Sequence, residues 1–501
     1  MSASKTKRVK TSSSPLVSAH LPLRRHSGVP LYRQIYDGFR QAILGGLLRS
    51  GQRIPSTRAL AAELEISRFP VLAAYEQLLH EGYLAGRIGA GTFVSGTLPD
   101  DALRPVAGAR ASGRSAQAAR PARPVRPEPE RERSDGGLRP FRMSLPGLDQ
   151  FPLAIWARLV ARHARALTPV LMAYGDPAGL QVLREAVAEY LRTARAVRCE
   201  ADQVIILSGS QAALRVAATV LLARGDLVAV EEPGYPGARD ALRASGAELA
   251  PVPVDEQGLS VAALERLGAR VRAAYVTPSH QYPLGVSMTA TRRLELLEWA
   301  DRHGSWLLED DYDSEYRYVS RPLGSLQGMD GHGRVIYIGS FSKVLFPSLR
   351  VGYLIVPQAL RQDFLEAREA LDIFSPALSQ LTLADFLAEG HFARHLRRMR
   401  AVYLNRRGAL LEGLTRYCAG RLTVLNADGG LHAAAALPAG TDDAAVVARM
   451  DRHGLTATAL STCYTIAPRR SGLLLGFGGF GERRLLEATR LLGTVLRRTG
   501  D

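Results

Sequence analysis

The chain has 501 residues, of which 46% are hydrophobic and 22% charged, and its formal net charge is +16. This length predicts two or three domains, and the composition is that of a water-soluble globular protein. No apolar run approaches the roughly 20 residues of a membrane span, and the basic, serine-rich N-terminus lacks the apolar stretch of a secretory signal. Cys199, Cys418 and Cys463 have neither disulfide nor metal-ligand spacing, so we expect a cytoplasmic protein without a metal site.

Residues 1–28 are expected to form a disordered basic tail, because they carry six lysines and arginines and no acidic residue. Positive charge concentrated at one end of a chain suggests a polyanion as the partner of that end. Basic tails are often only solubilising, so the charge alone leaves the partner open.

Residues 29–96 are predicted to form a small helical domain with a hairpin. Apolar residues at helical spacing cover 31–47, and Ser56 is placed to cap a second helix. A short turn then leads to another helix from Ser67, and glycine-rich strands follow within 82–94. A helix, a helix-turn-helix and a two-stranded wing together form an arrangement that reads DNA, with the second helix of the pair in the major groove.

This segment resembles the GntR-type winged helix in motifs that follow one another in order. They are Pro55-Ser56-x-Arg58, Ser67-Arg68, Leu78-x-x-Glu81-Gly82 and Arg87-x-Gly89-x-Gly91-Thr92-Phe93-Val94. The resemblance implies that Arg58 and Arg68 approach phosphates or guanines. It also implies that Ser67 caps the recognition helix and that Arg87 with Gly89 follows the minor groove.

Two residues depart from the GntR pattern. Members of that family usually carry a polar residue and a threonine after Ser-Arg, whereas this chain has Phe69 and Pro70. Proline is tolerated in a first helical turn, so the fold is expected to survive. The base preference is expected to differ from the usual one.

Residues 97–140 read as a linker, because they are rich in Ala, Arg, Pro and Gly and have almost no large apolar side chains. Residues 141–501 show a different pattern, in which short β-branched runs alternate with helical segments. The runs are Val204–Leu207, 227–230, 273–276, 306–309, 335–338 and 353–356. The pattern predicts an α/β domain with a mostly parallel sheet covered on both faces.

Lys343 is the only lysine after residue 10, and almost all other basic residues of the chain are arginines. A guanidinium effectively never loses its proton, whereas a neutral lysine amine attacks aldehydes to form a Schiff base. A codon bias against lysine, with Lys343 retained by chance, would explain the small number of lysines equally well. The residues around Lys343 favour the chemical explanation.

Those neighbours gather at the ends of predicted strands. Ser340, Ser342 and Arg350 suit a phosphate, and Gly209 with Ser210 and Gln211 forms a second cradle at a helix start. Asp310 is placed to keep a pyridine nitrogen protonated, Tyr312 and His280 to hold a ring oxygen, and Tyr235 to stack on the ring. Each residue alone has a structural explanation, but the set at successive strand ends does not.

Residues 141–499 resemble a fold-type I aminotransferase that binds pyridoxal 5'-phosphate (PLP), and the whole chain resembles a MocR/GabR-type regulator. The motifs that carry the resemblance are Tyr174-Gly-Asp-Pro-Ala-Gly179, Glu231-Glu-Pro-Gly-Tyr235, Thr277-Pro-Ser-His-Gln281, Glu309-Asp-Asp-Tyr-Asp-Ser-Glu315 and Ser340-Phe-Ser-Lys343. The resemblance implies that Lys343 forms the Schiff base with PLP and that Asp310 pairs with the pyridine nitrogen. It also implies that Tyr174 reaches the phosphate of the other subunit of a dimer.

The resemblance implies a PLP-dependent transcriptional regulator, in which an amine or PLP itself acts at Lys343. It further implies a head-to-tail homodimer on repeated DNA sites in a bacterial nucleoid. Two departures concern the effector: Gly237 stands where GABA-sensing relatives have an arginine, and the stretch 473–480 lacks the usual carboxylate-binding arginine. A working aminotransferase with an accessory DNA-binding domain and a regulator with a purely structural PLP site are the alternatives.

Overall fold

The computed structural model describes Leu23 and residues 28–87, 90–96, 138–318, 324–467 and 469–497. The chain divides into two compact units, Met1–Arg131 and Glu132–Asp501. Most of the predicted tail and of the predicted linker lies outside the described residues, as does Gly89. None of the helices in the described ranges is long and apolar enough to cross a membrane.

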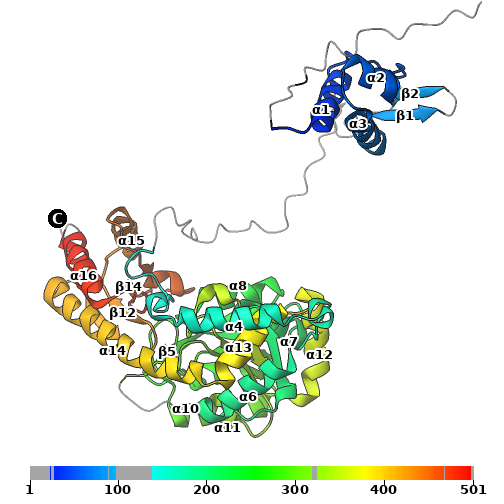
Figure 1. Cartoon of the computed structure of the whole chain (residues 1–501). Helices are drawn as coiled ribbons and strands as arrows, with labels where there is room; N and C mark the ends of the chain where they lie inside the picture. The colour runs from blue at the N-terminus through cyan, green and yellow to red at the C-terminus, as the bar shows by residue number, and fades with distance from the viewer. Residues whose placement is uncertain are drawn as a thin grey trace, which may run out of the picture. The chain divides into compact units, whose positions relative to one another are not determined.

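The amino-terminal unit consists of three helices and a hairpin (Figure 1). They are α1 (Leu31–Leu44), α2 (Thr57–Glu63), α3 (Arg68–His80), β1 (Leu84–Arg87) and β2 (Gly91–Val94). The first helix ends three residues earlier than predicted, because the Gly45-Gly46 turn begins there and Gly46 has a positive φ of 75°. Ser56 caps α2 as expected, since its hydroxyl accepts the Ala59 N–H at 3.2 Å. The antiparallel pair of β1 and β2 is the predicted wing.

One apolar core holds these elements together. Ile35 and Phe39 of α1 pack with Val71 and Tyr75 of α3, and all four are buried. The Tyr75 ring lies edge-on to Phe39 at 5.3 Å, and its hydroxyl donates to the carbonyl of Pro55 at 3.0 Å. This packing fixes which face of α3 points inward and leaves the opposite face exposed.

The carboxy-terminal unit is built on an eight-stranded sheet with the order β3-β10-β9-β8-β7-β4-β5-β6. Its strands are β3 (Val204–Leu207), β4 (Leu227–Glu232), β5 (Glu248–Asp255), β6 (Gly258–Leu259), β7 (Val271–Val276), β8 (Trp306–Asp311), β9 (Val335–Ser340) and β10 (Gly352–Ile355). The five strands β5, β4, β7, β8 and β9 run parallel, whereas β10 is antiparallel to both of its neighbours. The predicted mostly parallel sheet is confirmed.

Both faces of the sheet are covered because alternate strand residues point to opposite sides. In β3, Val204 and Ile206 pack into a core with helices α4, α6, α13 and α14, whereas Ile205 and Leu207 pack into a second core with α7, α8 and α12. Figure 1 shows α4, α6 and α13 together across one face. The helices are α4 (Leu153–Arg165), α5 (Pro169–Met172), α6 (Gln181–Arg195), α7 (Ser210–Leu221), α8 (Pro236–Ala244), α9 (Val261–Glu265), α10 (Ala290–His303), α11 (Leu326–Met329), α12 (Arg361–Asp372), α13 (Ala377–Ala388) and α14 (His391–Cys418).

A smaller antiparallel sheet follows α14 with the order β11-β12-β14-β13. Its elements are β11 (Thr423–Asn426), β12 (His432–Ala436), α15 (Asp443–Arg452), β13 (Thr458–Ala459), β14 (Gly472–Gly476) and α16 (Glu482–Arg497). The segment that enters the unit at residue 138 lies against this sheet, since the Gly476 N–H donates to the carbonyl of Phe141 at 2.9 Å.

All six strands predicted from β-branched runs are present, but the sequence did not indicate the smaller sheet or β5. Pro251 and Pro253 argue against a strand, because proline cannot donate to a ladder. They are tolerated in β5 because β6 pairs only with its last two residues, so most of β5 has one bonded neighbour.

Candidate cofactor site and DNA-binding surface

The predicted site residues come together because the strands that carry them end at the same edge of the large sheet. Asp310 lies near the end of β8, and Lys343 follows β9 by three residues. His280 follows β7, Tyr235 precedes α8 after β4, and Gly209 lies between β3 and α7. The carboxyl ends of parallel strands form the usual ligand-binding edge of an α/β sheet.

Lys343 is half-buried, and its Nζ donates to the carbonyl oxygen of Ser144 at 3.4 Å. Burial lowers the pKa of this amine to about 8, although the charges of Asp313 and Asp310 favour its protonated form. Near neutral pH a useful fraction of the amine is therefore uncharged, the form that attacks aldehydes.

Asp310 is a buried carboxylate that is only half satisfied. Its Oδ2 accepts a hydrogen bond from the Tyr275 hydroxyl at 2.7 Å, whereas its Oδ1 is buried with no partner among the described residues. Burial raises the pKa of Asp310 to about 7. A buried oxygen without a donor is costly, and a protonated ring nitrogen is a donor of the required kind.

The adjacent Asp311 is engaged elsewhere. Its carboxylate forms an ion pair with Arg195 at 2.8 Å and accepts from the Tyr337 hydroxyl at 2.6 Å. The neighbouring charge of Arg195 keeps its pKa below the ordinary value despite burial. Asp311 thus ties β8 to α6. Its Oδ1, like that of Asp310, has no hydrogen-bond partner among the described residues, but the charge of Asp311 is paired with Arg195, whereas Asp310 has no such ion pair there and remains available to a cationic ligand group.

Tyr312 and Asp313 both lie within hydrogen-bond distance of the same ring nitrogen of His280. His280 Nδ1 lies 2.9 Å from Asp313 Oδ1 and 3.0 Å from the Tyr312 hydroxyl. Burial raises the pKa of Tyr312 well above its usual value, so the phenol stays protonated. The structure brings Tyr312 and His280 together as predicted.

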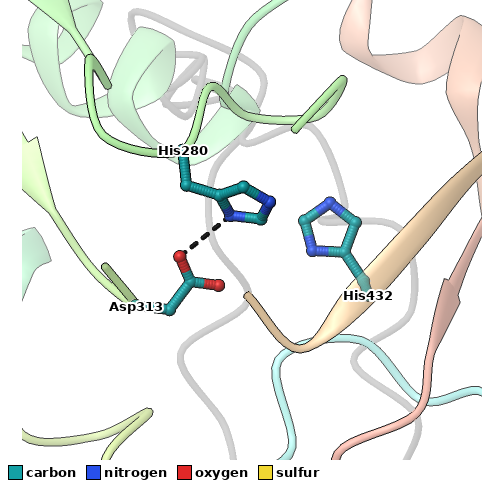
Figure 2. A group of neighbouring side chains, drawn as sticks. All are labelled: His280, Asp313 and His432. Carbon is teal, nitrogen blue, oxygen red and sulfur yellow. Dashed lines mark hydrogen bonds and ion pairs between the residues drawn. The ribbon is translucent and has the colours of Figure 1, made fainter. Parts of the chain in front are cut away.

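His432 of β12 completes this cluster, and no pattern in the sequence indicated it (Figure 2). Its ring lies 5.2 Å from that of His280, and its Nε2 is 3.1 Å from the carbonyl of Pro283. Burial lowers the pKa of His432 to about 4, so the ring is neutral. The potential ligand atoms of His280, Asp313 and His432 lie within 4.8 Å of one another, and the His280–Asp313 hydrogen bond accounts for their arrangement without an ion.

Tyr235 lies next to a second residue that the sequence did not single out, Tyr282. The two rings meet edge-on at 5.3 Å, and the Tyr282 ring also lies 6.3 Å from Tyr312 and 5.9 Å from His432. The Gln211 amide donates to the Tyr235 hydroxyl at 3.3 Å, so its side chain faces that phenol. Tyr282 lies two residues after His280 within the segment 277–285, and this spacing is the signal that could have identified it.

Gly209 and Arg350 line a small cradle at the start of α7. Gly209 has a φ of 125°, and a Cβ there would lie 3.5 Å from the Arg350 guanidinium nitrogens. Gly209 precedes α7, whose first N–H groups favour an anion. Beside it, the Ser342 N–H donates to Ser340 Oγ at 3.2 Å.

A cavity of about 370 Å³ adjoins this cradle, lined by Ser208, Arg350 and Phe374 among others. Tyr174 is 84% exposed, and its ring lies edge-on to Phe374 at 5.9 Å. The predicted phosphate ligand Tyr174 thus contacts a wall of the cavity beside Arg350.

The DNA-reading residues of the amino-terminal unit lie on its surface. Arg58 and Arg68 are exposed, and Arg68 Nε donates to Thr57 Oγ1 at 3.1 Å, which joins the starts of α2 and α3. Arg87 is exposed on the wing with its guanidinium 4.9 Å from the centre of the Phe93 ring. Arg53, which the sequence did not single out, is also exposed and lies against Gly91.

Ser67 occupies the N-cap position of α3, but its side chain makes no capping hydrogen bond there. The reason is Pro70, which stands at the third helical position and has no N–H to donate. Ser67 therefore stands at the N-cap position, as the resemblance implied, but its side chain does not cap the helix.

Comparisons with known proteins agree with this two-part architecture. Residues 31–94 match the bacterial regulatory proteins of the gntR family, and residues 147–472 match the class I and II aminotransferases. The chain is 39% identical to the probable rhizopine catabolism regulatory protein MocR of Rhizobium meliloti, over 94% of this chain and 95% of that protein. The chain belongs to the MocR-type regulators.

Three further similarities are to one regulator and to two aminotransferases of known structure. The pyridoxine biosynthesis transcriptional regulator PdxR of Corynebacterium glutamicum is 33% identical over 94% of this chain and 97% of its own. The α-aminoadipate aminotransferase LysN of Thermus thermophilus, solved with N-(5'-phosphopyridoxyl)-L-leucine, is 30% identical, has a TM-score of 0.67 and covers 72% of this chain and 92% of its own. The kynurenine aminotransferase of Pyrococcus horikoshii has a TM-score of 0.68 and is 26% identical over 73% of this chain and 92% of its own.

As a MocR-type regulator, the chain is a transcriptional regulator that binds DNA and uses PLP. Its residues fit that cofactor in three respects. Asp310 Oδ1 lacks a donor, the Gly209 cradle faces a guanidinium, and Lys343 is an amine with a lowered pKa. The DNA-binding function resides in the gntR segment.

Proposed function

We propose that an amine-bearing effector, or PLP itself, acts at Lys343 and thereby alters the affinity of the winged helix for DNA. The observation that carries this proposal is the Lys343 amine, half-buried at the carboxyl edge of the sheet with a pKa of about 8. When bound, PLP supplies an aldehyde that condenses reversibly with amines and a pyridine ring that withdraws electrons.

Each nearby side chain has a defined part in this proposal. Lys343 binds the aldehyde, and Asp310 accepts the ring N–H through Oδ1. Tyr312 and His280 face the ring hydroxyl, and Tyr235 stacks on the ring. The phosphate is held by Gly209, Ser210, Gln211, Ser340, Ser342 and Arg350.

The Lys343–Ser144 hydrogen bond supports a route from the site to the start of the unit. Ser144 lies in the segment that enters the unit at residue 138, directly after the predicted linker. Bound PLP would engage Nζ of Lys343, and the charges of Asp313 and Asp310 favour the protonated form of this amine whenever it is free. We infer that the altered charge shifts this segment and so changes DNA binding.

We further propose a homodimer that binds repeated DNA sites. Val170 and Met172, on α5, are 82% and 73% exposed, and Tyr174 follows them. Exposed apolar residues in one stretch favour an interface, and a partner copy would place its own Tyr174 near the cavity beside Arg350. Sedimentation equilibrium would show a monomer if this part of the proposal is wrong.

The experiment is DNA binding of the full-length protein, measured by fluorescence anisotropy on the duplex upstream of its own gene, at fixed salt and with increasing PLP. We expect the dissociation constant to change with PLP in the wild type and not in Lys343→Ala. Lys343→Arg is the matched control, because it keeps a cation but cannot condense with an aldehyde. A PLP response that survives in both variants would contradict the proposal.

A working aminotransferase is the second candidate, favoured by the full set of Lys343, Asp310 and Tyr312 at one strand edge. The apolar surroundings of β14 oppose it, since Leu473, Leu474 and Leu475 are fully buried and offer no charge to a substrate carboxylate. Multiple-turnover transamination of amino acids would favour this candidate over sensing.

A further inference from the structure

The first two turns of helix α3 expose two large apolar side chains. Val71, Ala74 and Tyr75 face the core, whereas Phe69 is 77% exposed and Leu72 is 36% exposed on the opposite side. Phe69 lies in the first turn, directly after the exposed Arg68. An exposed large aromatic on a helix that is already packed on its other face indicates a contact with another molecule.

The charges around Phe69 indicate which molecule that is. Arg68 is held at the start of α3 by its bond to Thr57, and Arg58 is exposed in the first turn of α2. Arg87 on the wing and Arg53, which forms a bridge to Phe93 of the wing, are exposed as well. An apolar spot flanked by arginines complements the major groove of DNA, where phosphates border the base edges. Since the described domain is a DNA-binding one, the occupant of this face is DNA.

The chemistry of Phe69 then selects a base. Residues in the first turn of a recognition helix contact base edges. In the major groove, the 5-methyl group of thymine is the apolar feature among hydrogen-bonding groups, and phenylalanine can contact that methyl but cannot bond to the other groups. The side chains of Pro70 and Leu72 offer no hydrogen bonds either, so the three residues beyond Arg68 that can face the groove would read bases by apolar contact.

We propose that Phe69 sets the base specificity of this regulator by packing on the 5-methyl group of a thymine in each half of its DNA site. The inference rests on the DNA-binding function and is independent of whether Lys343 mediates an effector response. Both can be measured on the same full-length protein, so failure of one is distinguishable from failure of the other.

The probe is a duplex selected by the full-length protein from a random-sequence pool, remade with each thymine replaced in turn by deoxyuridine. This replacement removes one methyl group and leaves every hydrogen bond in place. We expect one thymine in each half-site at which the replacement weakens binding roughly fourfold, and about sixteenfold when both are replaced, the scale of one buried methyl each.

The variant Phe69→Ala should bind the thymine duplex more weakly and lose the discrimination between thymine and deoxyuridine at that position. Phe69→Leu should retain part of it. Leu79→Ala is the matched control, because Leu79 is 38% exposed on the last turn of the same helix, and it should discriminate like the wild type. Phe69 is largely exposed, so each variant is expected to keep the wild-type melting temperature.

Two results would overturn the proposal. One is a selected site in which no thymine-to-deoxyuridine change weakens wild-type binding. The other is a methyl effect of the same size in Phe69→Ala as in the wild type, which would assign the methyl contact to another residue. Weaker DNA binding by Phe69→Ala with discrimination unchanged would count as the second result.

Discussion

Removing the hydroxyl of Tyr275 tests the part of the site that holds Asp310 in place. This hydroxyl donates to Asp310 Oδ2 at 2.7 Å and favours the charged form of the carboxylate, against a burial that raises its pKa to about 7. A hydrogen bond to a charged group is worth about 1.5 to 3 kcal/mol. In Tyr275→Phe we therefore expect PLP to bind roughly 10- to 150-fold more weakly and the pKa of Asp310 to rise further.

The assay is a titration of the apoprotein with PLP, followed by the absorbance of the lysine-bound cofactor. Tyr337→Phe is the matched control, because it removes the same kind of bond, at 2.6 Å, from the neighbouring Asp311. Both tyrosines are buried, so both variants should lose some stability against urea. Equal PLP affinities in the two variants would refute the assignment of Asp310 as the carboxylate that faces the ring.

Three further predictions concern the same residues. Borohydride reduction of the PLP complex should attach the cofactor at Lys343, seen by peptide mass spectrometry, and Lys343→Ala should lose the absorbance band while its circular dichroism stays unchanged. PLP affinity should increase as pH rises from about 6 to about 8. Binding needs Asp310 charged (pKa about 7) and Lys343 neutral (pKa about 8), so both groups lose protons on binding. A PLP affinity that does not change with pH would contradict this prediction. Arg68→Ala should weaken DNA binding and reduce its salt dependence without changing PLP uptake, and equal losses of both would contradict the separation of the two functions.

The order of motifs along the chain predicted the two-part organisation, because each motif depends on residues that are close together in the sequence. Ser56 caps a helix through a bond to a residue three positions on, and the short runs at 204–207 and 335–338 form strands wherever they are buried on both faces. The resemblance to regulators and aminotransferases was likewise readable from local motifs. The smaller sheet was not predicted, since β12 (His-Ala-Ala-Ala-Ala) and β14 (Gly-Leu-Leu-Leu-Gly) contain none of the β-branched residues that indicate a strand.

His432 and Tyr282 show why part of the site could not be read from the chain. His432 lies on a strand of the smaller sheet, and it meets His280, which follows β7 of the large sheet, only after the chain has folded. Its sequence neighbours, a run of alanines, carry no sign of that contact. Proximity across about 150 residues is a property of the tertiary structure.

The sequence by itself determined that Lys343 is the only lysine amine of the large domain, and the motif around it predicts that this amine is the reactive one. It also placed Asp310, Asp311 and Asp313 together, but it did not decide their separate roles. Neighbouring residues on a strand point to opposite faces, so Asp310 meets Tyr275 on one side of the sheet and Asp311 meets Arg195 on the other. Only the packing of α6 against one face pairs the charge of Asp311 with Arg195 and leaves Asp310 without an ion-pair partner among the described residues.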